Sequence, residues 1–247
     1  MLVQQADTIV ALTGAGISTP SGIPDFRSPT SGVWQNVDPM EVASIHAFQQ
    51  NPRPFYQWLH PLAKLMQTAQ PNAAHVALAE MEQQGRLKGI ITQNIDLLHQ
   101  QAGSTAVYEV HGNIRESTCM ACRQKTLSET YMGDYIATGN VPLCPYCAGV
   151  LKLDVILFGE MLPLATLQKA HREAERCDLM IVAGSSLEVS PVNELPWQAK
   201  QAGANLIIVN FSETHLDYLA DVIINADVVE ILPQLAAAVM EVHKINW

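Results

Sequence analysis

The sequence predicts a doubly wound α/β fold, in which helices cover both faces of a parallel sheet and a smaller domain is inserted. Short apolar runs indicate the buried strands, at residues 8–12, 89–92, 107–110, 155–158, 179–183 and 206–209. Runs that are apolar throughout are typical of parallel strands covered on both faces. Helical patterns separate several of these runs, which is the alternation expected of α/β folds. Residues 39–69 and 113–152 interrupt that alternation and therefore predict the insertion.

Apolar spacing and capping residues predict the helices. Asn72 is a suitable N-cap for a helix that ends before Gly85 and has its apolar face at Val76, Leu78 and Met81. A second helix is indicated by apolar residues at spacings of three and four, namely Leu164, Leu167, Ala170 and Ala174. Helical patterns also cover residues 193–200 and 232–242.

The two interrupting segments are expected to form the smaller domain together. Residues 39–69 are helical and rich in aromatic side chains, and residues 113–152 hold four of the five cysteines. The remaining residues, 1–38, 70–112 and 153–247, are expected to form the larger α/β domain.

Composition excludes several classes of protein. The 247 residues are 48% hydrophobic and 15% charged, which argues against intrinsic disorder. A formal charge of −10 makes direct binding of nucleic acid unexpected, because anionic surfaces repel phosphate backbones. The longest apolar run, residues 235–240, is too short to span a bilayer, and the N-terminus lacks the features of a signal peptide. We therefore expect a cytoplasmic protein with no membrane partner.

Four cysteines form two pairs that suit a metal ion. Cys119 and Cys122 make one pair, and Cys144 and Cys147 make the other, with 21 residues between the pairs. Two such pairs can complete a tetrahedral zinc site, and four thiolates leave no open position for catalysis. The pattern predicts one structural zinc, with buried free thiols or two disulfides as the alternatives. Cys177 stands alone and is expected to be a small core residue.

A glycine-rich loop follows the first predicted strand. Gly14 and Gly16 suit close approach of the backbone to a pyrophosphate, although Thr19 stands where a full dinucleotide motif has its third glycine. Asp38 precedes a helix rather than ending a second strand, so the ribose contact of dehydrogenases is missing. Hydride transfer is disfavoured, and an ordinary tight turn remains the alternative.

Polar residues follow the other predicted strands at the same edge of the sheet. They are Gln93, Asn94 and Asp96, His111, Gly184 with Ser185 and Ser186, and Asn210. Ligands of open α/β sheets bind at the carboxyl ends of the strands, so this distribution predicts a large crevice site.

Taken together, the motifs resemble those of the sirtuin family of NAD-dependent protein-lysine deacylases. They occur in the order Gly14-Ala-Gly-Ile-Ser18, Gly22-Ile-Pro-Asp-Phe-Arg27, Thr92-Gln-Asn-Ile-Asp96, His111-Gly-Asn113, the two cysteine pairs, Phe158-Gly-Glu160 and Gly184-Ser-Ser186. The resemblance runs from Thr8 to about Val229 and is closest to the compact bacterial and archaeal members. It implies a Rossmann-like large domain and a small domain built from a helical module and a zinc module.

The resemblance also implies roles for individual residues toward NAD. The cofactor loop would be lined by Gly14, Ala15, Gly16, Thr19, Phe26 and Arg27. Gln93 would hold the nicotinamide ribose, and Asn94 would order a water or the ribose beside it. Ile95 and Asp96 would grip the carboxamide. The phosphate, ribose and adenine at the far end would contact Gly184, Ser185, Ser186, Asn210 and Val228.

The implied reaction moves an acyl group from lysine to ADP-ribose and releases nicotinamide, with His111 as general base and Asn94 as its catalytic neighbour. Acetylated proteins would bind as an extended strand between two edges, formed by Phe158, Gly159 and Glu160 on one side and by Leu187 and Val189 on the other. A protein mono-ADP-ribosyltransferase is the alternative from the same cofactor chemistry, and a zinc-ribbon binding module is another.

Acyl preference is expected from the helical insertion. Family members that remove succinyl or malonyl groups carry a Tyr followed three residues later by an Arg. Here Tyr56 is present but Leu59 replaces the Arg, so acetyl and other neutral acyl groups are expected. Alternatively, Tyr56 and Trp58 only pack the small domain.

Overall fold

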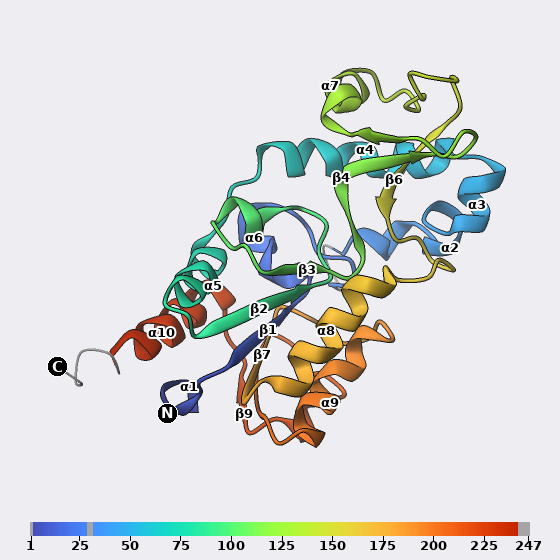
Figure 1. The fold of residues 1–247 in the computed structure, drawn as a ribbon. Helices are drawn as coiled ribbons and strands as arrows, with labels where there is room; N and C mark the ends of the chain where they lie inside the picture. Colours follow the sequence, from blue (N-terminus) through green and yellow to red (C-terminus); the bar gives the residue numbers. More distant parts are fainter. Residues whose placement is uncertain (1, 29–31, 242–247) are drawn as a thin grey trace.

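Six parallel strands form the main sheet of the computed structural model, which describes residues 2–28 and 32–241 (Figure 1). Their spatial order is β3-β2-β1-β7-β8-β9. The bounds are Ile9–Thr13 for β1, Leu87–Thr92 for β2, Val107–Glu109 for β3, Leu179–Ala183 for β7, Asn205–Val209 for β8 and Val222–Ile224 for β9. The chain order runs outward from β1 on one side and from β7 on the other. Strands β1 and β7 therefore meet at a topological switch point, where α/β proteins bind ligands.

Helices cover both faces of this sheet, as Figure 1 shows. On one face lie α1 (Leu2–Gln5), α5 (Ala73–Gln83) and α10 (Val228–Glu241), and on the other lie α8 (Leu164–Arg176) and α9 (Leu195–Gln201). Strand β1 is buried throughout and faces both cores: Ile9 and Ala11 pack in the first, and Val10 and Leu12 pack in the second. The predicted doubly wound sheet is confirmed.

The predicted cap of α5 is present, with one error in the predicted apolar face. Asn72 accepts a hydrogen bond from Ala74 N (3.0 Å), and the ring of His75 completes a capping box by accepting one from Asn72 N. Val76 was assigned to the buried face but is exposed, because the helix turns it away from the core that holds Leu78. Val242, the last residue of the helix expected over 232–242, lies outside the described residues.

A second sheet with the order β5-β4-β6 and four helices share another core. The strands are β4 (Gly112–Cys119), β5 (Lys125–Leu127) and β6 (Leu151–Val155), all antiparallel. The helices around them are α2 (Pro39–Val42), α3 (Ile45–Gln50), α4 (Arg53–Thr68) and α7 (Glu129–Thr138). Tyr135 of α7 donates a hydrogen bond to the carbonyl of Tyr56 in α4 (2.5 Å), which joins the two inserted segments.

The prediction of a main-sheet strand over 155–158 is wrong. Strand β6 ends at Val155 and pairs with β4, and the apolar run continues as a loop whose Leu157 packs in the small-domain core. Strand β9 was not predicted, because it has only three residues at the edge of the sheet and is partly exposed. The remaining elements are α6 (Leu98–Gln101) and 3-10 helices at Ala15–Ile17, Thr19–Ser21, Val33–Asn36, Val192–Glu194 and Asp217–Leu219. Within the described ranges, no helix is long and apolar enough to cross a membrane.

Candidate active site

The loops that follow β1 and β7 pack directly on each other at the switch point. Gly16 N donates a hydrogen bond to Gly184 O (2.8 Å). A Cβ atom at Gly14 would lie 2.8 Å from the same carbonyl oxygen, and a Cβ atom at Gly16 would also lie 2.8 Å from it. The glycines are therefore needed for the contact between the two loops. Thr19 stands where a full dinucleotide motif has its third glycine, so the packing on Gly184 accounts for Gly14 and Gly16 better than that motif does.

A buried polar cluster lies behind the first loop. Ser18 donates from Oγ to Asp96 Oδ2 (2.6 Å) and accepts from Asn94 Nδ2 (3.1 Å). Asn94 Nδ2 also contacts Gly14 O (3.1 Å), and Asp96 Oδ1 accepts from Leu98 N (3.0 Å). Burial raises the pKa of Asp96, and hydrogen bonds with Ser18, Leu98 N and Asn94 oppose that shift. The role of Ser18 was not predicted from the sequence, although Ser18 ends the Gly14–Ser18 motif.

Ser185 connects two parts of the crevice. Its Oγ accepts from Gln93 Nε2 (2.8 Å) and from Leu187 N (3.2 Å). A hydroxyl oxygen has two lone pairs, so both acceptor positions are used and only its hydrogen remains available. Ser185 can therefore donate to an anionic oxygen while it fixes both Gln93 and the start of the 187–189 segment.

His111 lies beside Gln93, and one of its ring nitrogens has no hydrogen-bond partner among the residues that the structure describes. Its Nδ1 is 3.2 Å from Gln93 O, and a carbonyl can only accept, so Nδ1 carries the hydrogen and Nε2 is left as the acceptor. Burial lowers the pKa of His111, the Gln93 carbonyl opposes this, and the charge of Arg27 lowers it further. The imidazole is therefore neutral at pH 7, as a general base must be.

An aromatic stack joins the loop after β1, at Phe26, to the small domain. The ring of Trp34 stacks on Phe26 (centroids 5.3 Å apart) and on Trp58 of α4 (4.8 Å, interplanar angle 9°). It also meets Phe158 edge-on at 6.3 Å. Trp34 was not predicted as a site residue, because no local sequence pattern shows that these four rings meet.

Other predicted cofactor residues lie around the crevice in less specific settings. Thr19 Oγ1 donates to Gly16 O (3.0 Å), and Ala15 begins a 3-10 helix. Asn210 follows β8 and donates from Nδ2 to Ser212 O (2.9 Å). Ser186 is half-buried, and its hydroxyl makes no hydrogen bond among the described residues. The other two predicted residues are apolar: Ile95 packs against the small-domain core, and Val228 is buried at the start of α10.

The segment containing Phe158, Gly159 and Glu160 is held firmly from one side. Phe158 N donates to Ala43 O (2.9 Å), and Phe158 O accepts from Ile45 N (3.0 Å). The buried ammonium of Lys152 contacts Glu160 Oε2 (2.9 Å) and two backbone carbonyls, and Leu157 N donates to the same Glu160 oxygen (2.9 Å). Within the described residues, the backbone N–H and C=O of Gly159 make no hydrogen bond.

Tyr56 does not lie free in the site. It is fully buried, its hydroxyl donates to Leu151 O (2.5 Å), and Leu59 is buried in the same core. Of the two alternatives, Tyr56 therefore packs the small domain, whereas Trp58 also contacts Trp34 as described above.

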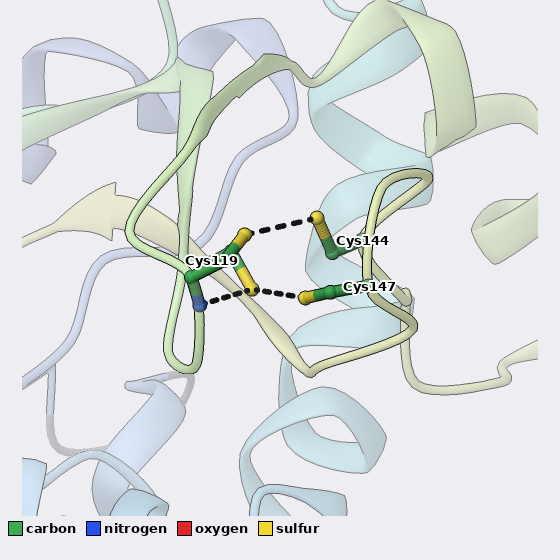
Figure 2. Close-up of side chains that lie close together, drawn as sticks. Cys119, Cys144 and Cys147 are labelled. Atoms are coloured by element: carbon green, nitrogen blue, oxygen red, sulfur yellow. Dashed lines mark hydrogen bonds between the residues drawn. The ribbon is translucent and has the colours of Figure 1, made fainter.

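The four paired cysteines converge, as Figure 2 shows for the loops that carry them. All four Sγ atoms lie within 4.8 Å of one another, with Cys119 and Cys147 3.5 Å apart and Cys122 and Cys144 3.7 Å apart. A zinc–sulfur distance of about 2.3 Å implies sulfur separations of roughly 3.8 Å in a tetrahedron, which agrees with these values. The cysteines are free rather than disulfide-bonded, so the donor set fits one zinc ion with no vacant position.

Comparison with known proteins agrees with this geometry. The model of the Sir2 family matches residues 14–191. NAD-dependent protein deacetylase 2 of Caldanaerobacter subterraneus subsp. tengcongensis is 48% identical over 90% of this chain and 87% of that protein. NAD-dependent protein deacylase 2 of Archaeoglobus fulgidus is 45% identical over 93% of this chain and 90% of that protein.

Solved structures give the same result. A Sir2 structure with a deacetylated p53 peptide and 3′-O-acetyl-ADP-ribose has a TM-score of 0.88 and 42% identity, covering 97% of this chain and 95% of that one. A Sir2 structure with p53 peptide and NAD⁺ has a TM-score of 0.85 and 43% identity, covering 99% and 97%. The predicted resemblance is confirmed, and this chain belongs to the Sir2 family.

Proposed function

We propose that this protein removes acetyl and other neutral acyl groups from protein lysines in an NAD-dependent reaction. The acyl-lysine reacts with NAD and one water molecule, and nicotinamide, O-acyl-ADP-ribose and free lysine are the products. The observation that carries this proposal is His111, a neutral imidazole with a free Nε2 at the carboxyl edge of the sheet, held by the carbonyl of Gln93. Relatives that are NAD-dependent deacetylases and deacylases support it.

Bound NAD supplies the ribose carbon that accepts the acyl oxygen and supplies nicotinamide as the leaving group. Asp96 and the backbone of Ile95 match the donors and acceptors of a carboxamide, and the buried position of Asp96 strengthens such contacts. Asn94 is oriented by Ser18 and Gly14, so it can order a water or a ribose hydroxyl.

His111 acts on a ribose hydroxyl. Its Nε2 accepts the proton when that hydroxyl attacks the former carbonyl carbon of the acyl group. A lowered pKa keeps the imidazole unprotonated near neutral pH, which a base requires. A simple ADP-ribosyl transfer does not include this attack of the ribose hydroxyl on the acyl carbon, and so it needs no base at His111.

The substrate peptide binds as an added strand between the 158–160 and 187–189 segments. Main-chain hydrogen bonds then supply much of the affinity with little demand on sequence. The acyl group is neutral because Tyr56 is engaged with Leu151 and Leu59 offers no charge to a buried carboxylate.

The zinc module serves the fold. Zinc bound by Cys119, Cys122, Cys144 and Cys147 would be saturated and would hold the two cysteine loops together. We do not expect this module to bind nucleic acid, because Lys125 is already paired with Glu116 and Asp154.

Labelled NAD with an acetylated peptide tests the proposal. With the label in the ADP-ribose half, mass spectrometry should find deacetylated peptide and labelled O-acetyl-ADP-ribose in equal amounts. Label attached covalently to peptide or protein, with the acetyl group still on lysine, would instead indicate a mono-ADP-ribosyltransferase.

A further inference from the structure

Glu188 occupies the centre of the 187–189 segment and points outward. Its side chain is 58% exposed, whereas Leu187 before it is buried and Val189 after it is half-buried. Ser185 Oγ accepts from Leu187 N, and Val189 O accepts from Asn193 N (3.1 Å), so both ends of the segment are fixed. In the described part of the chain, the backbone N–H and C=O of Glu188 make no hydrogen bond.

The carboxylate of Glu188 joins this segment to the cofactor loop. Glu188 Oε2 is 2.8 Å from Arg27 Nε, and the Arg27 side chain is 37% exposed. Arg27 lies close enough to His111 for its charge to lower the pKa of that imidazole. One ion pair therefore connects the proposed peptide edge with the loop proposed to contact NAD.

We propose that Glu188 recognises a basic residue directly beside the acyl-lysine of the substrate, and that this residue releases Arg27 to the cofactor. The inference rests on the proposed function, and in particular on binding of the peptide as a strand. Successive side chains of an extended peptide point to opposite faces. An acyl-lysine that enters the crevice therefore places its two neighbours on the outer side, where Glu188 lies.

A cross-strand pair is the expected contact. Residues directly opposite on paired strands have Cβ atoms about 4.5–5.5 Å apart, and opposite charges there attract. The carboxylate of Glu188 has two oxygens, and its ion pair with Arg27 uses Oε2. A lysine or arginine of the peptide can thus bind Glu188 and then replace Arg27. The net charge of −10 adds a weaker attraction that does not depend on position.

Release of Arg27 has a consequence for NAD. A guanidinium has five donors in a planar fork and binds phosphate oxygens bidentately. While Arg27 donates from Nε to Glu188, that donor is not available to a phosphate. A peptide with a basic neighbour therefore lowers the NAD concentration needed, and by linkage NAD strengthens the binding of that peptide.

Two matched peptides test this inference on the full-length protein. They differ only beside the acetyl-lysine, where one has arginine and the other has citrulline, which has nearly the same shape without charge. The wild type should show a kcat/KM about 1.4- to 5-fold higher for the arginine peptide, the range expected of an exposed ion pair. It should also show a lower KM for NAD with that peptide.

The variant E188Q should show a kcat/KM ratio near 1 and the same KM for NAD with both peptides. The control is E175Q, which removes an exposed charge from α8 and should keep the wild-type ratio. Persistence of the arginine preference in E188Q would overturn the inference, as would an equal loss in E175Q, which would assign the preference to net charge.

Failure of this inference differs from failure of the proposed function. If the wild type deacetylates both peptides with equal kcat/KM, only the role of Glu188 is wrong. If it deacetylates neither peptide, the proposed function is wrong as well. A KM for NAD that does not respond to the arginine would contradict the release of Arg27 even if the peptide preference were found.

Discussion

Replacing Ser185 with alanine tests whether one hydroxyl holds both the cofactor side and the peptide side of the crevice. The substitution removes the acceptor of Gln93 Nε2 and of Leu187 N. It also removes the one hydroxyl hydrogen that is available to a phosphate. Stability, peptide binding and NAD binding should therefore all change.

The loss of stability can be estimated from the two donors. Leu187 N is buried, so leaving it without an acceptor costs roughly 1–3 kcal/mol. The Gln93 amide is only partly buried and can turn to water, so its lost bond costs about 0.5–1 kcal/mol. The sum is about 1.5–4 kcal/mol, which for a chain of this length lowers Tm by roughly 3–16 °C.

Calorimetry and steady-state kinetics on S185A provide the assay. Loss of a hydrogen bond to a charged phosphate should raise the KM for NAD by about 10- to 100-fold. The control is S186A, which should keep the wild-type Tm because Ser186 makes no side-chain hydrogen bond among the described residues. If S185A unfolds at the wild-type temperature, the assignment of two accepted bonds to Ser185 is refuted.

Three further predictions concern zinc, acyl preference and pH. Replacing Cys144 with serine should lower zinc content, solubility and Tm together, because metal binding at such a site is largely folding energy. A variant that folds normally and loses only catalysis would contradict this. The kcat/KM for acetyl-lysine should exceed that for succinyl-lysine in one peptide, since Leu59 supplies no cation and Tyr56 is engaged in the core. Equal or higher efficiency on succinyl-lysine would contradict it. Burial lowers the pKa of His75 to about 4 and that of His99 to about 3, so the folded state binds fewer protons. The free energy of unfolding should therefore fall as pH decreases from 6.5 to 5, measured in urea. A value that stays constant over this interval would show that these rings are not buried and neutral.

Local patterns in the sequence were sufficient for much of the fold. Strand β7 has the predicted bounds of Leu179 to Ala183. A strand that is buried on both faces is apolar throughout, and here polar or glycine residues stand on either side of the run. Asn72 caps α5 as expected, since a cap depends only on residues within one turn. The prediction of a main-sheet strand over 155–158 was wrong because apolar loop residues that pack in a core have the same composition as a buried strand.

The site was predictable in its residues but not in its contacts. Motifs identified Asp96 and His111, yet the hydrogen bond from Ser18 to Asp96 joins residues 78 positions apart. The stack of Trp34 on Trp58 and the ion pair between Arg27 and Glu188 depend on loops that meet only after folding. No spacing rule encodes such pairs in a single sequence.

Comparing two rates in the H111A variant tests whether His111 is the general base. Exchange of labelled nicotinamide into NAD in the presence of acetyl-peptide reports the first step, which does not use the imidazole. Release of deacetylated peptide reports the second. We expect exchange to persist while deacetylation falls by about 10²- to 10⁴-fold, the usual cost of losing a positioned base. Deacetylation by H111A at the wild-type rate, with the fold intact by its Tm, would contradict it.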